Sequence, residues 1–183
     1  MKSISTVATP AILEAINALR EDFELDIEFK IYYPNQIDDE EVEDEPLKKD
    51  LKESDIVLID IRGGGRSSEI VYDALKEEKN IVLNLVGPMS KLMEITRLGS
   101  FSGAKIASRI SSSTEVDNPE ELWQKIERAQ NMVETAGKIL PFKSVKDAGN
   151  YIKALKYWRY GGKENYYQGY YKIESRTVQR FTP

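Results

Sequence analysis

The sequence predicts an α/β fold of three layers, in which a mostly parallel open sheet of four to five strands lies between helices. Its central unit is Asp55–Glu78, where the apolar run DIVLIDI precedes a glycine-rich turn, RGGGRSS, and a helical segment, EIVYDALKEE. A short apolar run without alternation is typical of a parallel strand buried on both faces. Ligands of such sheets collect at the carboxyl ends of the strands.

Two strands and two helices are predicted before the central unit. Ser3–Thr9 is strand-like, and Pro10–Arg20 has apolar residues at helical spacing after a proline that suits a helix start. Leu25–Tyr33 alternates apolar and polar residues, as a half-buried strand near a sheet edge does. We interpret the acidic run Asp38–Glu45 as a solvated loop, with a cation or basic-partner site as the less favoured alternative. A short helix follows at Pro46–Glu53.

Further elements are predicted after the central unit. They begin with a strand at Asn80–Val86, a short helix at Met89–Leu98 and a glycine-serine turn at Gly99–Ser102. Lys105–Ile110 suits either a fifth strand or a helical turn. A long helix is expected at Pro119–Leu140, because its apolar residues recur at three- and four-residue spacing and its first turn is acidic.

The C-terminal part is predicted to be helical. Ser144–Tyr160 and Lys163–Ile173 are the two expected helices, and Glu174–Pro183 is polar and is expected to be a frayed tail. We therefore divide the chain into a flavodoxin- or Rossmann-like α/β domain over 1–140 and a helical extension over 141–183.

The composition excludes several classes of chemistry. The net charge of −5 comes without a basic run, so no nucleic-acid partner is expected. No apolar segment reaches the roughly 18 residues of a membrane span, and there is no signal-peptide pattern, so a cytoplasmic location is expected. The chain has no Cys and no His, which excludes a thiol nucleophile, a Ser-His-Asp triad and an imidazole-ligated metal. We expect no metal site and no firmly bound cofactor.

Two segments carry the candidate ligand-binding residues. Glycines after a strand let backbone N–H groups converge on an anion, and arginines pair with carboxylates; the first segment offers Arg62, Gly63, Gly64, Gly65, Arg66 and Ser67. It matches neither a Walker loop nor the dinucleotide fingerprint, and a tight turn alone also explains its glycines. The second segment is expected at the same sheet edge and offers Thr96, Arg97, Ser100 and Ser102. No residue is assigned a catalytic role.

Two patches of sequence stand out together. The first is Met89–Ser102, MSKLMEITRLGSFS, with Leu98, Gly99 and Phe101 as its defining residues. The second is Lys138–Asn165, with Leu140, Pro141, Asp147, Tyr151, Leu155, Tyr157, Trp158, Gly161, Gly162, Glu164 and Asn165. In this order they resemble the N-terminal region of the large-subunit family of magnesium chelatase and cobaltochelatase. The resemblance covers about Ser3 to Asn165.

This resemblance implies a role in a larger enzyme. Large subunits of the family bind the tetrapyrrole and insert magnesium or cobalt, a ligase reaction of chlorophyll- or cobalamin-type biosynthesis, while two AAA-type partner subunits hydrolyse ATP. The chain corresponds only to their N-terminal part, which implies scaffolding, tetrapyrrole contact or subunit contact and no catalysis by this chain alone. Its implied partners are the rest of the large subunit and the AAA-type ATPase subunits. An excised domain, a truncated relative and one piece of a split subunit are three open alternatives.

A rival hypothesis is a flavodoxin-like or response-regulator-like module that binds a phosphorylated ligand or a partner protein. Asp60 offers one carboxylate for such a site, although the pattern places it inside the predicted strand. Tyrosines also cluster in the segment Tyr151–Tyr171, where they suit helix packing, an interface or a ligand platform. We expect the chain to self-associate through this cluster.

Overall fold

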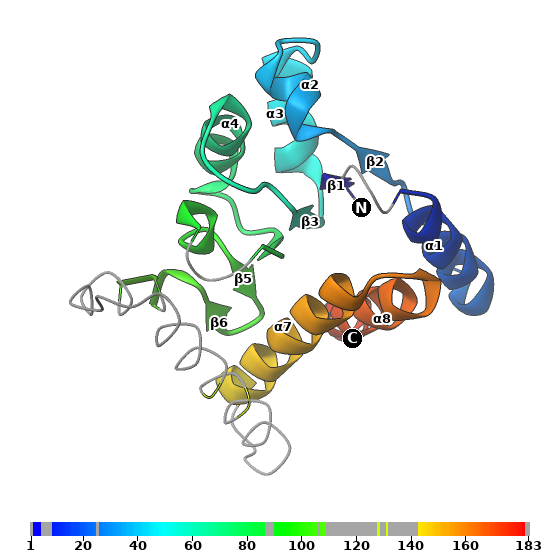
Figure 1. Ribbon diagram of the computed structural model, residues 1–183. Helices are drawn as coiled ribbons and strands as arrows, with labels where there is room; N and C mark the ends of the chain where they lie inside the picture. Colours follow the sequence, from blue (N-terminus) through cyan, green and yellow to red (C-terminus); the bar gives the residue numbers. More distant parts are fainter. Residues whose placement is uncertain are drawn as a thin grey trace.

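The computed structural model (Figure 1) describes residues 2–4, 9–24, 26–86, 90–105, 107, 108, 128, 131 and 143–181. They form one six-stranded sheet, in the order β2-β1-β3-β4-β5-β6, with helices against both of its faces. The predicted α/β fold, with a mostly parallel open sheet and C-terminal helices, is therefore confirmed.

The four strands on one side of the sheet are parallel, and the last two form an antiparallel hairpin. The parallel strands are β1 (Lys2–Ile4), β2 (Lys30–Ile31), β3 (Ile56–Ile59) and β4 (Ile81–Asn84). The hairpin consists of β5 (Arg97–Leu98) and β6 (Phe101–Ser102), and β5 runs antiparallel to β4. The order 2-1-3-4 is the flavodoxin-like order, with its topological switch point between β1 and β3.

The central strand β3 is buried on both faces, as its apolar sequence predicts. Ile56 and Leu58 belong to one apolar cluster, while Val57 and Ile59 belong to the cluster on the other face. This division follows from the two-residue period of a strand, which points successive side chains to opposite faces. An unbroken apolar run is thus what a strand between two helix layers requires.

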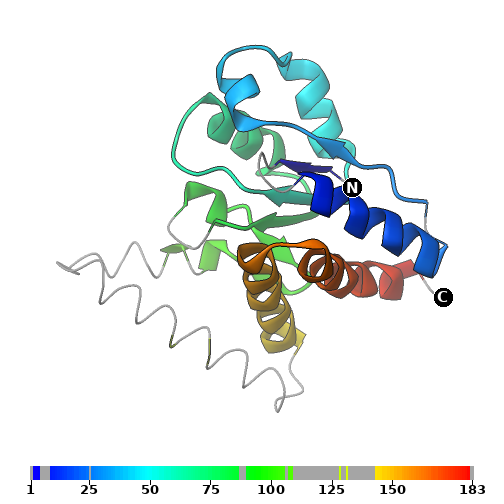
Figure 2. The same cartoon turned by 45° about the vertical axis from the view of Figure 1, so that its right-hand side comes forward.

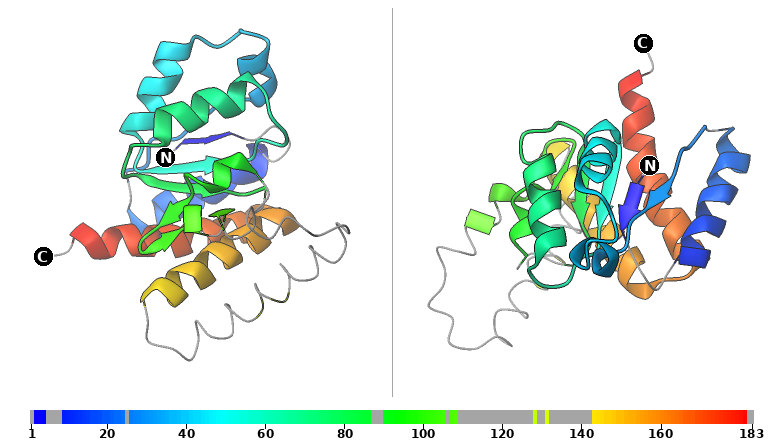
Figure 3. Two further views of the ribbon diagram at one scale, coloured as in Figure 1. Left: turned by 90° about the vertical axis from the view of Figure 1, so that its left-hand side faces the viewer. Right: turned by 90° about the horizontal axis from the view of Figure 1, so that it is seen from above.

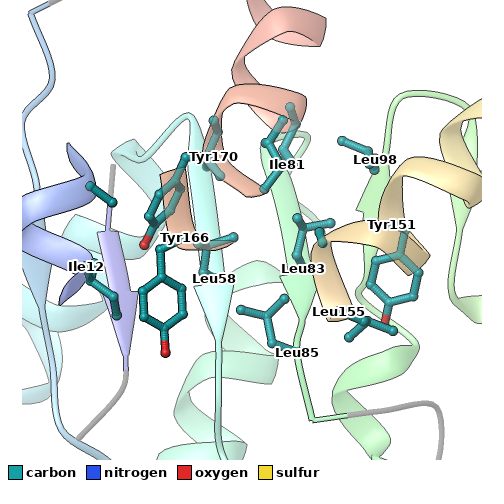
Figure 4. Packing of buried hydrophobic residues seen from close by; sticks show 14 of the residues in the cluster. Ile12, Leu58, Ile81, Leu83, Leu85, Leu98, Tyr151, Leu155, Tyr166 and Tyr170 are labelled. Carbon is teal, nitrogen blue, oxygen red and sulfur yellow. The ribbon is translucent and has the colours of Figure 1, made fainter. Parts of the chain in front are cut away.

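Three helices cover the first face of the sheet. They are α1 (Thr9–Phe23), α7 (Lys143–Tyr160) and α8 (Lys163–Phe181). Figure 2 shows α1 and α8 close together on this side of the sheet. Figure 4 shows side chains of all three helices meeting those of β3 and β4, including Ile12, Leu58, Leu83, Tyr151, Leu155, Tyr166 and Tyr170. The C-terminal helices therefore share a core with the sheet.

The second face is covered by α2 (Pro34–Asp38), α3 (Asp44–Glu53), α4 (Arg66–Leu75) and the 3-10 turn η1 (Lys91–Met93). Figure 3 shows α3 and α4 on one side of the strands and α7 and α8 on the other. The helix predicted after the glycine-rich turn is α4, and its apolar residues Ile70, Val71, Ala74 and Leu75 are all buried against the sheet.

Several predicted elements differ from the observed ones. The strand predicted at Leu25–Tyr33 is only Lys30–Ile31, because its partner β1 pairs with just these two residues. The acidic segment Asp38–Glu45 is a loop only in its middle, since α3 begins at Asp44, where acidic side chains suit the helix N-terminus. The helix predicted at Met89–Leu98 is wrong beyond the short turn η1: Arg97–Leu98 is β5.

The remaining differences lie towards the C-terminus. Phe101–Ser102 forms β6, so only the first half of the predicted glycine-serine turn is a turn. The described residues of Lys105–Ile110 are helical. The polar tail expected at Glu174–Pro183 continues α8 as far as Phe181. The helix predicted at Pro119–Leu140 lies outside the described residues except at two positions, and so does the expected domain boundary at Leu140. None of the described helices has the length and apolar character that crossing a bilayer requires.

Candidate functional site

The switch point of the sheet is where its topology favours a ligand. The chain leaves β1 for α1, on one face, and leaves β3 for α4, on the other face. Such divergence leaves a crevice outside the carboxyl ends of the two strands. Asp60 follows β3 directly, since the strand ends at Ile59. The expectation that Asp60 lies inside the strand is therefore wrong, and its carboxylate belongs to this edge.

The glycine-rich loop follows Asp60 at the same edge. Gly63 and Gly65 have φ values of 100° and 133°, a region that side-chain-bearing residues rarely adopt. A Cβ atom added to Gly63 or Gly64 would meet no other atom within 4 Å, so this backbone is open to solvent. The Arg62 side chain is 85% exposed. The loop thus presents one exposed guanidinium beside accessible backbone.

The N-terminus of α4 already carries an acidic side chain. Asp38, at the end of α2, accepts a hydrogen bond through Oδ1 from the backbone N–H of Ser67, at 2.6 Å. Glycine is favoured at position 65 by its φ of 133°, whereas a Cβ there would only make an ordinary contact with this oxygen, at 3.4 Å. A carboxylate at a helix N-terminus satisfies one of its N–H groups and interacts favourably with the helix dipole. Anion binding by Ser67 would therefore compete with Asp38.

The two arginines of this loop have different surroundings. Arg66 donates hydrogen bonds to the carbonyl of Ile37 and to the carboxylate of Asp44. These contacts tie α2 and α3 to the first turn of α4. Among the residues that the structure describes, Arg62 has only a longer ion pair, 3.7 Å from its Nε to Asp60 Oδ1. Of the two, Arg62 has the guanidinium that is accessible to an anion from solution.

The C-terminal helices reach the same edge through Trp158. Its indole Nε1 donates a hydrogen bond to Asp60 Oδ2 at 3.0 Å. The Tyr166 ring lies beside the indole, with ring centroids 5.0 Å apart. Burial raises the pKa of Tyr166, and the nearby Asp60 carboxylate raises it further. Trp158 and Asp60 are far apart in the sequence, so no local sequence pattern could predict that they pair.

Arg97 lies at the opposite edge of the sheet. It donates to the Asn80 carbonyl at 2.7 Å, to the Leu75 carbonyl at 3.0 Å and to the Ile95 carbonyl at 3.1 Å. Asn80 precedes β4, so these contacts mark the amino ends of the parallel strands. Partial burial lowers the pKa of Arg97. The expectation that Arg97 lies beside the glycine loop is wrong, because β5 runs antiparallel to β4 and returns the chain to the other edge.

The other three residues of this segment have internal partners. Thr96 is buried, and its hydroxyl donates to the Leu92 carbonyl at 3.0 Å and accepts from the backbone N–H of Asn84 at 3.3 Å. Ser100 donates to the Asp147 carboxylate, and Ser102 pairs with Arg97 in the hairpin. These contacts hold the β5–β6 hairpin against its neighbours. Ligand binding by this segment stays a prediction.

The two patches that resemble the chelatase family contact one another. Asp147 of α7 reaches the hairpin turn, and the Phe101 and Tyr151 rings stack with centroids 4.8 Å apart. The Tyr151 hydroxyl then donates to the Asn84 carbonyl, at the end of β4, at 2.8 Å. Tyr151 and Leu98 lie on the same side of the sheet in Figure 4. Residues defined by resemblance in separate parts of the sequence therefore form one packed unit.

The hollows that bear on this site are small. Between the sheet and the helix pair α7–α8 is a cavity of about 10 Å³, lined in part by Leu58, Leu85, Trp158 and Tyr166. This is about the space that a single water occupies. A shallower hollow of about 330 Å³ lies elsewhere, lined by Tyr72, Lys76, Glu94, Ile95, Ala104, Ala107 and Ser108. Across the described part of the chain, no three acidic side chains group closely enough to hold a metal ion.

Fold and site together define an α/β protein of flavodoxin-like strand order, whose switch point is covered on one face by C-terminal helices. Residues 4–152 match the family described as a domain of unknown function, DUF3479. The match spans most of the chain, so the chain belongs to this family. It includes both sides of the contact between the hairpin and α7, and it ends inside α7. No curated protein matches the sequence.

Proposed function

We propose that this chain is the N-terminal domain, or a truncated homologue, of the large subunit of a tetrapyrrole metal chelatase. The observation that carries the proposal is the packing of its two family-like patches, Met89–Ser102 and Lys138–Asn165, through Asp147 and Tyr151. Patches that merely resembled the family by chance would have no reason to meet. A further support is the extent of the family match, since residues 4–152 cover most of the stretch, about Ser3 to Asn165, over which the sequence resembles the chelatase large subunits.

The proposed role is scaffolding, tetrapyrrole contact or subunit contact within an ATP-dependent chelatase. The partners in this proposal are the remainder of the large subunit and the AAA-type ATPase subunits, in the cytoplasm. The tetrapyrrole is the substrate of the full assembly. This chain supplies no catalytic residue in the proposal.

Tetrapyrrole contact would centre on Arg62. Tetrapyrroles carry carboxylate side chains, which pair well with an exposed guanidinium. The other two candidates already have partners within the protein. Arg66 donates to the Ile37 carbonyl and to the Asp44 carboxylate, and Arg97 donates to the Asn80 carbonyl. The exposed Arg62, the open backbone of Gly63 and Gly64, and the switch-point position favour the same edge of the sheet.

A fluorescence titration tests this proposal. The chain has two tryptophans, Trp123 and Trp158, so W123F leaves Trp158 as the single reporter at the switch point. This variant is titrated with a corrinoid precursor and with a free-base porphyrin, and we expect saturable quenching of Trp158 by one of them. The same titration on Arg62→Ala should give a weaker affinity.

The matched control is Arg159→Ala, because Arg159 is also exposed and follows Trp158 directly but lies outside the glycine loop. It should leave the affinity unchanged. Equal loss in both variants would point to non-specific attraction of the anionic tetrapyrrole. Absence of binding would restrict the role to scaffolding or subunit contact, which co-sedimentation with the AAA-type subunits then tests.

A flavodoxin-like or response-regulator-like module is a second candidate. It is favoured by the strand order 2-1-3-4 and by the position of Asp60 directly after the central strand. Its ligand would be a phosphorylated molecule, of which flavin mononucleotide is the simplest probe. Binding of this flavin, seen as a shift of its visible spectrum, together with no response to porphyrin or corrinoid would favour this candidate over the first.

Self-association through the segment Tyr151–Tyr171 is also proposed. Tyr151, Tyr166 and Tyr170 are buried among helices, whereas Tyr160 is 78% exposed and Tyr171 is partly exposed. Helix packing thus accounts for part of the cluster, and the exposed rings are those available to a second copy. Light scattering of the wild type and of Tyr160→Ser over a range of concentrations tests this, and a monomer throughout contradicts it.

A further inference from the structure

The chain itself covers the carboxyl end of its central strand. Trp158, near the end of α7, lies over this end and donates a hydrogen bond to Asp60, whose side chain is only 16% exposed. The donor and the acceptor are 98 residues apart in sequence. In a sheet of this order, the crevice beside Asp60 is the place that a ligand would take. Here an indole ring of the same protein lies at its margin.

The segment that carries this indole is a sharp corner. We use the name corner for Trp158–Asn165, where α7 ends and α8 begins. Gly161 and Gly162 both have positive φ, 64° and 84°, and a Cβ on Gly162 would contact nothing within 4 Å. Tyr160, which precedes them, is 78% exposed. A Cβ on Gly161, by contrast, would lie 3.3 Å from the Tyr166 hydroxyl. The two glycines give this turn more backbone freedom than the helices on either side of it.

The contact beneath the corner is incompletely packed. A cavity of about 10 Å³ lies here, lined in part by Trp158, Tyr166, Leu58 and Leu85. Lost van der Waals contacts at such a gap weaken the attachment of the corner to the sheet. Asp60 also has a second partner, since Arg62 Nε lies 3.7 Å from its other oxygen. Of these two contacts of Asp60, the hydrogen bond from Trp158, at 3.0 Å, is the shorter.

We propose that the corner is an intramolecular closure of the switch-point crevice, held shut by the hydrogen bond between Trp158 and Asp60. Opening would expose the Asp60 carboxylate, the Arg62 guanidinium and the open backbone of Gly63 and Gly64. The ligand class that fits has a planar ring, which takes the place of the indole, and an acidic group, which pairs with Arg62. The closure does not depend on the proposed chelatase role. Only the choice of a tetrapyrrole as the particular ligand of this class rests on that role.

The closure is tested without any ligand. In the W123F background, quenching of Trp158 by acrylamide measures how often the indole is exposed to solvent. Asp60→Ala removes the acceptor and should raise the quenching constant severalfold, while Asp60→Asn keeps a weaker, neutral acceptor of the same shape and should raise it by a smaller amount. The matched control is Glu94→Ala, because Glu94 accepts a hydrogen bond from the Tyr72 hydroxyl far from the corner. It should not change the quenching.

Two results would overturn the closure. In the first, the quenching constant of Asp60→Ala equals that of the Glu94→Ala control, while an unchanged far-ultraviolet circular dichroism spectrum shows that the variant is folded. The other applies where Asp60→Ala fails to fold: Asp60→Asn, whose neutral acceptor forms a weaker bond, would then show no more quenching than Glu94→Gln. A rise confined to the Asp60 variants supports the closure.

The ligand class is tested separately with Trp158→Ala, which removes the closing ring. A dicarboxylate porphyrin and flavin mononucleotide are titrated by their own visible absorbance. A closed majority state lowers the apparent affinity in proportion to the open fraction, so one probe should bind the variant severalfold more tightly than the wild type. Tighter porphyrin binding assigns a tetrapyrrole, and tighter flavin binding assigns a phosphorylated planar ligand. If each probe binds the variant and the wild type with equal affinity, the closure does not control ligand access and the proposal is overturned. Equal porphyrin binding to the variant and the wild type would still support the chelatase proposal.

Discussion

Asp147 and Ser100 are joined by two hydrogen bonds to one carboxylate oxygen. The Ser100 backbone N–H donates to Asp147 Oδ2 at 2.9 Å, and the Ser100 hydroxyl donates to the same oxygen at 2.7 Å. Asp147 is only 4% exposed, and a carboxylate in such a place requires hydrogen-bonding partners. The pair fixes the N-terminal half of α7 to the β5–β6 hairpin, and so joins the two family-like patches.

This pair yields a graded prediction of stability. Ser100→Ala removes one of the two bonds and should lower the free energy of unfolding by about 1.5–3 kcal/mol, as expected for a bond to a charged group. Asp147→Ala removes both bonds and should cost more. Urea denaturation measures both variants. Ser108→Ala is the control, since its exposed hydroxyl bonds only to Lys105 nearby, and equal losses for all three variants would contradict the prediction.

The hairpin turn should tolerate no side chain at Gly99. Its φ of 59° alone costs about 1–2 kcal/mol for alanine, and a Cβ there would lie 2.5 Å from Asp147 Oδ2. Gly162 has a similar φ of 84° but nothing within 4 Å of an added Cβ. Gly99→Ala should therefore destabilise the protein clearly more than Gly162→Ala in thermal unfolding. Similar losses would mean that only the backbone angle matters.

Arg97 and Arg62 should separate stability from binding. Arg97→Ala removes the guanidinium hydrogen bonds to the carbonyls of Leu75, Asn80 and Ile95, which should cost about 2 kcal/mol or more in urea denaturation. Arg62→Ala removes only a long contact of an exposed side chain and should leave the stability unchanged. At temperatures where both variants are folded, only Arg62→Ala should weaken tetrapyrrole binding. The reverse pattern would place the ligand at the other sheet edge.

Buried tyrosines should make the protein less stable at alkaline pH. Burial raises the pKa of Tyr151 well above its ordinary value of 10.0. Its unfolded form therefore loses its proton first, and the free energy of unfolding falls as the pH rises above about 10. Burial and the hydrogen bond to Asp50 likewise raise the pKa of Tyr32 to about 12.

Tyr151→Phe isolates the contribution of Tyr151. At pH 7 the variant should be less stable by about 1–3 kcal/mol, because the buried hydrogen bond from the Tyr151 hydroxyl to the Asn84 carbonyl is lost. Since phenylalanine does not titrate, the difference between wild type and variant should narrow from pH 9 to pH 11 in denaturant titrations at each pH. A constant difference would show that Tyr151 ionises alike in both states.

Local patterns predicted the elements whose cause is local. The apolar run of β3 and the helix α4 after the glycine turn follow from short segments, and both lie where the sequence places them. Two-residue strands such as β5 and β6 have no detectable period, so they were missed. The alternation of Leu25–Tyr33 predicted a longer strand than β2, because the length of the pairing depends on β1.

The site depends on contacts that no local pattern contains. The glycine loop follows β3 as predicted, but Asp38, which occupies the N-terminus of α4, comes from 29 residues earlier in the chain. Arg97 was assigned to the wrong edge, because the antiparallel direction of β5 is decided by pairing with β4. Asp147 was visible only through the resemblance, and its partner Ser100 was predicted as a ligand-binding residue.

The position where the family match ends has a consequence for anyone who prepares a shorter protein. Residue 152 lies in the middle of α7, and the core on that face continues through Leu155, Tyr166, Tyr170 and Ile173. A fragment that ends there would expose the apolar side of α1 and of β3 to water, and such an exposed apolar surface promotes aggregation. The segment that matches the family and the segment that shares one core are thus different lengths of chain, and expression trials should extend at least to the end of α8.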